Sequence, residues 1–507
     1  MSALSSSRFS RRSVLVGLAG SAAAVLLAAC GGPASTPEPT KPAAAPAPTQ
    51  APAATQAPAA TQAPAATKPA AEATKPAAEA AKPTAALAPT VAATTRPLTK
   101  EKIHLVFQGH VAGGQDEQNA YDNTLDAWHK EHPNIEIEYA VVADPERIQK
   151  VTAQVAANQA PDMWRHNHNV VRLWASQGHL LDLSDRLKGY DKLFLAALAQ
   201  CCTFKGKLYA LPHTTDTSAL FYRTDALDAI GVKAPAANEM EKSWTFEQFG
   251  DICDKLLKLG KQQYAFTHNQ GGGRWLAHFL YGAGGKIVTD DHTKIAINSP
   301  EGIRALQFVK NWTDKKWAPV SVWTMASMRN ADTDPFCQGT TSMGLLGQWN
   351  ITYLSDQIKN SFQWNVTFAP RDKVQSTSMG GTPIVIWAKT KYPDECAAFF
   401  EFFESPPMLR MFDEMANYLP VRLDLAAQKI NYKTRPDLMA WFQEQIKTIP
   451  TAWADWVGLT YNSGVSTIIN EETTKMMSAG QSAEDTAKNI ETRGNKFIAD
   501  NPDVEKK

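Results

Sequence analysis

Several short runs of this sequence combine aromatic, carboxylate, imidazole and amide side chains. Trp349 directly follows a Gly-Gln pair, Asp216 lies in a run of hydroxyl-bearing residues, and His166, Asn167 and His168 are consecutive. Flat aromatic faces stack on apolar ring faces, whereas carboxylate, amide and imidazole groups exchange hydrogen bonds with hydroxyls. These residue types predict a binding site for a small ligand that has both apolar faces and hydroxyl groups.

Each of these residues also has an ordinary structural explanation, which stays open at this point. Trp349 could fill a core, and Asp216 could cap a helix or a turn. His166 and His168 are two residues apart and could ligate a metal. No cysteine or carboxylate stands at a ligand spacing from them, so we expect hydrogen bonds to a ligand, with no metal and no cofactor.

Other candidates lie in glycine-containing loops, where the backbone can come close to a ligand. Gln108 and His110 belong to a loop that follows the first predicted strand. Arg274 and Trp275 follow three consecutive glycines, and Arg274 could bridge two hydroxyls. Gly380 and Gly381 precede a late buried strand; the full set of residues predicted so far is Gln108, His110, His166, Asn167, His168, Asp216, Arg274, Trp275, Trp349, Gly380 and Gly381.

Composition and motifs exclude several classes of function. Lys plus Arg and Asp plus Glu both number 51 in 507 residues, so the chain shows no excess charge for nucleic acid. A phosphate-binding loop, G-x-S-x-G and H-E-x-x-H are all absent. We therefore expect a protein that is not an enzyme and does not bind nucleic acid.

The first 97 residues read as targeting and tether segments. Arg8, Arg11 and Arg12 precede a short apolar run that ends in LAAC at Cys30, which resembles the bacterial lipobox with Cys30 as the lipidated residue. The alternative is an ordinary secretory signal, and export by the Sec or the twin-arginine route stays open. Residues 31–97 are repetitive and rich in Pro and Ala, without aromatic residues, and predict a disordered tether.

The remainder alternates strand and helix patterns, which predicts an α/β fold with a parallel sheet. Strands are expected at 103–107, 135–142 and 161–164, with ligand loops at their carboxyl ends. Residues 204–212 read as a hairpin with Gly206 in its turn, and 213–218 as a polar crossover to a new strand. Thr224 and Asp225 are expected to cap a short helix that Gly231 ends.

Several separate segments resemble the extracellular solute-binding proteins of ABC importers, in the carbohydrate-binding branch that includes the maltose-type proteins. The resemblance covers nearly all of residues 100–507. It rests on 125–135 (LDAWHKEHPNI), 160–162 (APD), 204–212 (FKGKLYALP), 221–225 (FYRTD), 244–249 (WTFEQF), 336–349 (FCQGTTSMGLLGQW) and 418–422 (YLPVR). Arg223 stands where the family commonly has Asn, which leaves the cargo open.

The resemblance implies a two-lobe periplasmic-binding-protein fold of type II, with a hinge of crossing strands and one ligand clamped between the lobes. Lobe 1 would be 98–215 with 378–420, and lobe 2 would be 216–377 with 421–507. It assigns Trp349, Asp216 and Trp456 to ligand contact, with Trp453 competing for the place of Trp456.

The function implied is a monomeric, lipid-anchored receptor on the outer face of the cell membrane. It captures a mono- or oligosaccharide and delivers it to the permease subunits of an ABC transporter. Rival cargoes are a polyamine or a glycerol phosphodiester. A surface glycosidase is the rival from another class, but it needs a second carboxylate near Asp216, and none is evident.

Overall fold

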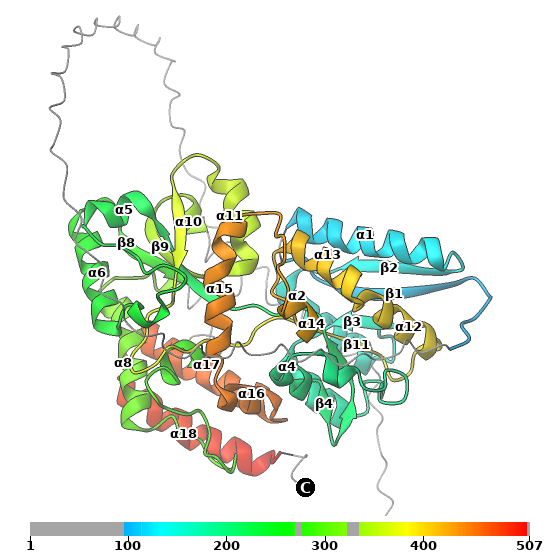
Figure 1. Cartoon of the computed structure of the whole chain (residues 1–507). Helices are drawn as coiled ribbons and strands as arrows, with labels where there is room; N and C mark the ends of the chain where they lie inside the picture. Colours follow the sequence, from blue (N-terminus) through cyan, green and yellow to red (C-terminus); the bar gives the residue numbers. More distant parts are fainter. Residues whose placement is uncertain (1–95, 113, 269–275, 322–333, 504–507) are drawn as a thin grey trace, which may run out of the picture. The chain divides into compact units, whose positions relative to one another are not determined.

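The computed structural model describes residues 96–112, 114–268, 276–321 and 334–503. These residues belong to one compact unit of the chain, residues 82–507, whose elements are labelled in Figure 1. Strands and helices alternate along it and form two separate main sheets, one of five strands and one of four. The expected α/β class is confirmed, and each main sheet with its helices is called a lobe below.

The first lobe contains the five-stranded sheet, in the order β2-β1-β3-β11-β6. β1, β2 and β3 are parallel as predicted, but β11 is antiparallel to both β3 and β6. The parallel arrangement predicted from these first strands is confirmed, and the sheet as a whole is mixed because β11 begins at the end of the sheet where β3 and β6 finish. The strands are β1 (Ile103–Gly109), β2 (Ile135–Val141), β3 (Met163–Arg165), β6 (Ala210–Pro212) and β11 (Pro383–Ile386).

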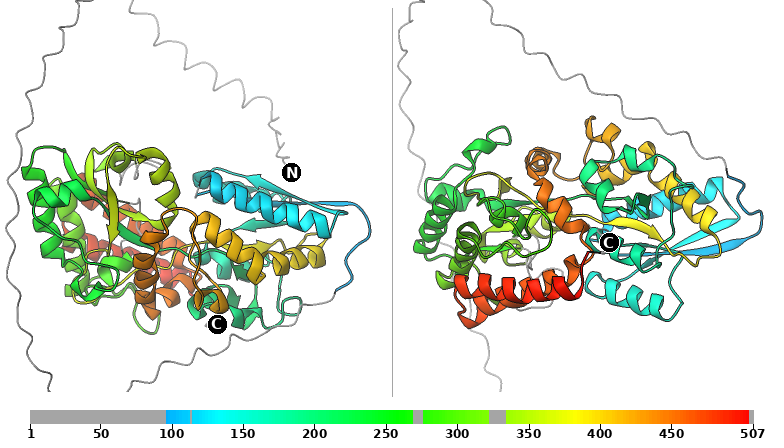
Figure 2. Two further views of the ribbon diagram at one scale, coloured as in Figure 1. Left: turned by 45° about the horizontal axis from the view of Figure 1, so that its top comes forward. Right: turned by 90° about the horizontal axis from the view of Figure 1, so that it is seen from below.

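Helices pack against the strands of this sheet. Trp128 on α1 is 1% exposed, and its indole Nε1 donates to Ile135 O at 3.1 Å, which fixes the helix against the start of β2. α1 also packs against α12 and α13, which come from much later in the chain (Figure 2). The helices are α1 (Gln115–Glu131), α2 (Asp144–Ala156), α3 (His168–Ser176), α4 (Ala196–Cys201), α12 (Pro393–Phe403), α13 (Pro406–Ala416) and α14 (Leu423–Ala426).

The second lobe contains the four-stranded sheet, in the order β10-β7-β9-β8. Its strands are β7 (Ser218–Arg223), β8 (Tyr264–His268), β9 (Thr341–Gly347) and β10 (Trp364–Thr367). Its helices are α5 (Thr224–Ala229), α6 (Phe246–Lys258), α8 (Pro300–Asp314), α10 (Asp334–Cys337), α11 (Ile351–Ile358), α15 (Met439–Gln445), α16 (Thr451–Gly458), α17 (Asn462–Ala479) and α18 (Ala483–Asp500). α17 and α18 pack against each other and against α8 (Figure 2).

The predicted hairpin is confirmed, but it is shorter than expected. β4 (Thr203–Phe204) pairs with β5 (Lys207–Leu208), and the turn between them has positive φ at Lys205 (48°) and Gly206 (73°). Leu211 belongs instead to β6 in the five-stranded sheet.

The short helix after the crossover starts differently from the prediction. Thr224 is the first residue of α5, the N-cap is Arg223, and no side chain caps this helix. The capping prediction for Thr224 and Asp225 is therefore wrong, because Thr224 Oγ1 donates to Gln363 O at 3.3 Å and Asp225 pairs with the guanidinium of Arg223. Gly231, at φ 67°, ends the helix as predicted.

The chain passes between the two sheets three times. Residues 213–217 connect β6 to β7, and residues 368–382 connect β10 back to β11. The first crossing thus coincides with the polar crossover predicted at residues 213–218. A third passage, residues 427–438, leads from α14, which packs on α13, to α15, which packs on β7. The predicted division of the chain into lobes stays a prediction.

The cysteines of the described residues are all free thiols. Cys201, Cys202, Cys253 and Cys396 are buried, whereas Cys337 is partly exposed. Burial raises the pKa of Cys201 to about 12, so this thiol stays protonated and behaves as a small apolar group. Across the described ranges, no helix combines the length and apolar character needed to cross a bilayer.

Candidate ligand-binding site at the crossings

The first crossing (residues 213–217) and the return crossing (residues 368–382), called the second crossing below, lie against each other. Thr382 N donates to Thr214 Oγ1 at 3.0 Å, and Gly380 N donates to Asp216 O at 3.0 Å. A Cβ added at Gly381, which has φ 88°, would lie 1.9 Å from Thr214 O, so this close approach requires glycine. The two predicted glycines and Asp216 are therefore neighbours in the fold.

Gln348 connects the second lobe to the first crossing. Its side chain donates from Nε2 to Thr215 O at 3.2 Å and accepts at Oε1 from Thr217 N at 3.0 Å. Sequence reasoning did not single out Gln348, although its place next to Trp349 was a usable signal. The Gln348 side chain is 0% exposed. Its two hydrogen bonds hold the backbone next to Trp349 against the first crossing.

Trp349 lies in a short 3-10 turn (η4, Gln348–Asn350) that continues β9. The ring is half-buried and folds back over the backbone of Gly347, where an added Cβ would lie 1.6 Å from Trp349 Cζ3. The glycine before the tryptophan therefore makes room for the indole itself. A half-buried indole keeps part of its surface available for stacking on a ligand.

His168 belongs to the first lobe and Asp216 to the first crossing, and the fold brings the two side chains close together. His168 is the first residue of α3, and it is hydrogen-bonded to the backbone of Gly381 and close enough to Asp216 to feel its charge. Both side chains are 5% exposed. Burial lowers the pKa of His168 to about 4 and outweighs the opposing effects of Gly381 and Asp216, so the imidazole is neutral at pH 7.

His166 follows β3 and lies beside the end of the second crossing. Its N–H donates to Pro383 O at 2.8 Å, and its ring packs edge-on against Trp174 at a centroid distance of 4.5 Å. Burial and the nearby charge of Arg147 lower the pKa of His166 to about 3. Asn167, the next residue, is half-buried and accepts from Arg147 Nη2 at 2.5 Å.

The loop after β1 is held by a buried ion pair that sequence reasoning missed. Arg165 Nη1 lies 2.6 Å from Glu117 Oε1 and donates to His110 O at 2.7 Å, and Glu117 Oε2 accepts from Ala112 N at 2.7 Å. Gln108 and His110 are 3% and 6% exposed. The pair fixes the loop at the carboxyl end of β1, where ligand contacts are expected in an α/β sheet.

Comparison with known proteins supports the architecture. A family model described as a bacterial extracellular solute-binding protein matches residues 123–440, more than half of the chain. This chain belongs to that family. Similar solved proteins have two lobes, as seen here: the chain has a TM-score of 0.66 to the GacH receptor of Streptomyces glaucescens, solved with acarbose, at 22% identity over 78% of this chain and 98% of that one.

Three further proteins are similar to this family member. UgpB from Mycobacterium tuberculosis, solved with glycerophosphocholine, has a TM-score of 0.67 at 16% identity over 78% of this chain and 98% of that one. A probable ABC transporter-binding protein of Deinococcus radiodurans is 26% identical over 51% of this chain, and the match spans 62% of its length. The maltodextrin-binding protein MdxE of Bacillus subtilis is 22% identical over 62% of this chain and 74% of that protein.

The structure of this solute-binding protein separates the two competing tryptophans of α16. Trp456 is 1% exposed within the core, whereas Trp453 is 5% exposed and points its Nε1 at Met379 O, 3.5 Å away in the second crossing. Trp453 is thus the one that reaches the crossings. Ligand contact by Trp456 stays a prediction.

Of the predicted residues, Asp216, His168, Gly380 and Gly381 are in direct proximity. His166, Asn167 and Trp349 join them through neighbouring backbone contacts, and Gln108 and His110 lie at the end of β1. Arg274, Trp275 and Cys30 lie outside the described residues. In the part of the chain that is described, no group of three His, Cys, Asp or Glu residues could hold a metal ion.

Proposed function

We propose that this protein is the lipid-anchored receptor of an ABC importer, which captures a carbohydrate between its lobes and delivers it to a permease. In this proposal it acts as a monomer, without catalysis, on the outer face of the cell membrane. The observation that carries it is the meeting of polar side chains from both lobes at the crossings, in a chain of the solute-binding family.

The chemistry of these side chains suits an uncharged polyol. The two imidazoles are neutral at pH 7 because the pKa values of His166 and His168 are lowered to about 3 and about 4, mainly by burial. Each neutral ring offers one donor and one acceptor, and a carboxylate such as Asp216 accepts two hydroxyl hydrogen bonds. Trp349 adds an aromatic face for the apolar side of a sugar ring.

Ligand entry requires the lobes to separate. Asp216, His166 and His168 are at most 5% exposed, so no sugar reaches them without a change of conformation. Three passages of chain between the sheets provide the positions at which backbone angles can change. Ligand that contacts both lobes then shifts the population toward the closed form.

A thermal-shift screen of the full chain tests the cargo. We expect one or more mono- or oligosaccharides to raise Tm by several degrees, since a ligand that binds only the native state stabilises it. The screen also contains glycerophosphocholine and putrescine. A shift with either of these and with no sugar would overturn the carbohydrate proposal and leave the receptor role standing.

Glycerol phosphodiester is the second candidate cargo, because UgpB shares the fold and Arg147 lies near His166. The Arg147 guanidinium is already bonded to Asn167, and Asp216 would repel a phosphate. Arg147→Gln separates the two cargoes. It should abolish the binding of a phosphodiester but change the affinity for a neutral sugar by less than about threefold, measured by calorimetry.

A further inference from the structure

α16 belongs to the second lobe by its position in the chain, but most of its helix contacts are with the first lobe. It stands between α15, which packs on β7, and α17, which packs on α18 and α8 and also contacts α16 and α3. α16 itself packs against α3 and α4 of the first lobe, as Figure 1 shows for α4. This helix is therefore a contact between lobes that lies outside the three chain crossings.

Specific polar contacts hold α16 to α4. Gln200 Nε2 donates to Asp455 Oδ1 at 2.9 Å, and Cys201 Sγ lies 3.7 Å from Ala454 O. Arg172 of α3 donates from Nη2 to Gln200 O at 3.0 Å, so α3 and α4 present a joint surface to α16.

Shape complementarity adds to these hydrogen bonds. A Cβ added at Gly458, the last residue of α16, would lie 3.0 Å from Cζ and Nη1 of Arg172. The guanidinium thus lies directly on the glycine backbone, and any larger side chain at position 458 would displace it.

Further contacts connect α16 to two parts of the candidate ligand site, namely the residues next to His168 and the second crossing. Asn169, next to His168, donates from Nδ2 to Asn462 Oδ1 at 3.2 Å. Asn462 in turn donates to Trp456 O at 3.0 Å, and Trp453 on the same helix reaches Met379 O of the second crossing. Moving α16 away from α3 and α4 would therefore move aromatic side chains away from His168.

We propose that Gln200, Asp455 and Arg172 are positioning residues that form a clasp between the lobes and set how strongly the receptor holds its ligand. The clasp is defined here as the Gln200–Asp455 hydrogen bond together with Arg172 against Gly458. The inference rests on the proposed function, because a contact made only when the lobes meet raises affinity by stabilising the closed state.

Hydrogen–deuterium exchange of the ligand-free full chain tests the clasp without any knowledge of the cargo. Asp455→Ala and Gln200→Ala should each speed exchange of the peptides that cover 196–201 and 451–458 by about fivefold, which corresponds to one hydrogen bond. The double variant should be no faster than either single variant, because both remove the same bond. Gly458→Leu, which displaces Arg172, should give the largest increase.

Rescue separates a positioning role from a general structural one. Asp455→Asn keeps the Oδ1 acceptor and should exchange within about twofold of the wild type. Asp290→Asn, which breaks an exposed pair with Lys286 in the second lobe, is the matched control and should change neither peptide. Additive effects in the double variant, or no rescue by asparagine, would overturn the clasp.

The ligand readout uses whichever sugar the thermal-shift screen identifies. Asp455→Ala should raise Kd about fivefold, mostly through a faster dissociation rate, while Asp455→Asn should leave Kd near the wild-type value. If no sugar binds, the proposed function fails while the exchange result still decides the clasp. If a sugar binds and the alanine variants change neither exchange nor Kd, the clasp fails and the proposed function stands.

Discussion

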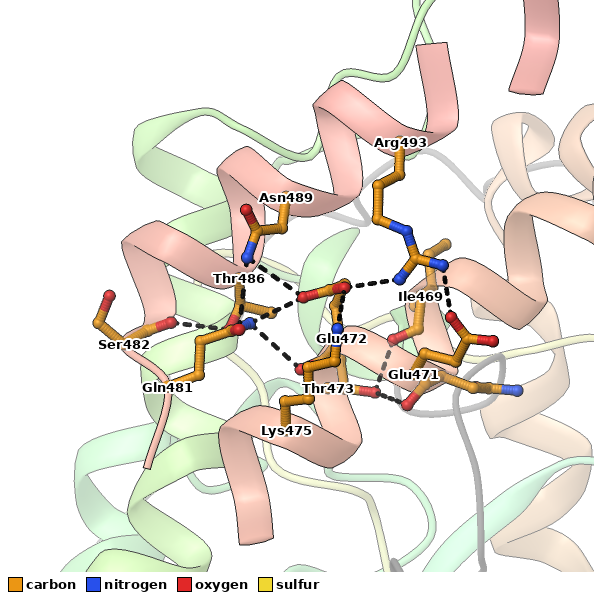
Figure 3. Close-up of polar contacts among 11 residues, drawn as sticks. Ile469, Glu471, Glu472, Thr473, Lys475, Gln481, Ser482, Thr486, Asn489 and Arg493 are labelled. Atoms are coloured by element: carbon orange, nitrogen blue, oxygen red, sulfur yellow. Dashed lines mark hydrogen bonds and ion pairs between the residues drawn. The ribbon is translucent and has the colours of Figure 1, made fainter. Parts of the chain in front are cut away.

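Two buried polar regions of this protein differ in how well their hydrogen-bonding groups are satisfied. On α17, the Glu472 carboxylate is 1% exposed and accepts from four side chains, as Figure 3 shows: Lys475 at 2.7 Å, Arg493 at 2.6 Å, Gln481 at 3.1 Å and Asn489 at 3.2 Å. At the crossings, buried atoms have no hydrogen-bond partner within the described chain. They are both ring nitrogens of His166, Nε2 of His168, Oγ1 of Thr215 and Oγ of Ser378.

The difference indicates that the Glu472 network stabilises the fold, whereas the crossings can still form hydrogen bonds with a ligand. A buried polar atom without a partner loses its hydration and gains nothing in return, so such atoms are rare unless water, an ion or a ligand completes them. Glu472 has used its lone pairs and can only stabilise the join of α17 to α18. The crossings retain donors and acceptors that a polyol can satisfy.

Trp349→Ala should show the largest difference between the two regions, because it should weaken ligand binding more than any other change. We expect Kd for the identified sugar to rise at least 100-fold, about 2.7 kcal/mol, because a stacked aromatic face is lost in a closed site. Calorimetry measures the affinity, and Trp349→Phe, which keeps a smaller ring, should retain most of it. Sugar binding that survives the alanine change would show that Trp349 only fills space.

Glu472→Gln should act on stability and leave affinity alone. Burial opposes ionisation of Glu472, but hydrogen bonds from Lys475, Arg493 and Gln481 outweigh it and lower its pKa to about 2. Removing this charge should reduce the free energy of unfolding at pH 7 by roughly 2 kcal/mol. Urea unfolding measures the loss, and Glu484→Gln at an exposed position of α18 is the matched control.

The pH dependence of the stability of Glu472→Gln shows which protonation state of Glu472 stabilises the fold. Because the folded pKa lies below the ordinary Glu value of about 4.5, the stabilisation by Glu472 is complete above pH 4.5 and is lost as pH falls toward 2. The difference between wild type and Glu472→Gln should shrink over that interval. A difference that is constant with pH would mean that the ionised form is not what matters.

The sequence predicted the course of the chain more fully than the contacts of the site. Residues 204–223 carry a turn glycine, a proline and a polar run, so local chemistry indicated a hairpin followed by a crossover. Thr245 with Gln248 forms a capping box at the start of α6, and the Ser299 side chain caps α8. These features depend on neighbours within a few residues.

Contacts between distant segments were not predictable in this way. The direction of β11 depends on where the chain returns from the second lobe, and the Glu117–Arg165 pair joins residues 48 positions apart. α16 reads as an ordinary helix of the second lobe, and only packing shows that it lies on α3 and α4. No local pattern records such long-range partners.

Asp413 provides a third case, a buried and unsatisfied carboxyl group on α13 rather than at the proposed ligand contacts. It is 0% exposed and neither oxygen has a hydrogen-bond partner within the described chain; burial, with help from Glu414, raises its pKa well above the usual range. Asp413→Asn should raise the free energy of unfolding at pH 7 by about 1 kcal/mol. The wild type must either bury an unpaired charge or keep the carboxyl group protonated, and asparagine requires neither.

The direction in which the free energy of unfolding changes with pH distinguishes the cost of a buried carboxyl group from simple repacking. A raised folded pKa means that the stability of the wild type falls as pH rises above the ordinary value of 3.8. The advantage of Asp413→Asn should therefore be small at pH 4 and larger at pH 8 in urea unfolding. Asp228→Asn, at an exposed position of α5, is the control and should show little change. An advantage that is equal at both pH values would contradict the assignment of a costly buried carboxyl group.

The smallest expected effect is that of pH on ligand binding. The pKa values of His166 and His168 are lowered to about 3 and about 4, mainly by burial, so both rings are neutral from pH 8 down to about pH 5. Kd for the identified sugar should stay within about twofold across that range, and binding should weaken only near pH 4, where protonation of His168 removes its acceptor. Calorimetry at pH 8, 6.5 and 5 measures this. A change in Kd centred near pH 6.5 would show that these imidazoles titrate like exposed ones, and the contrast between the unsatisfied crossings and the satisfied Glu472 network would then no longer identify the ligand site.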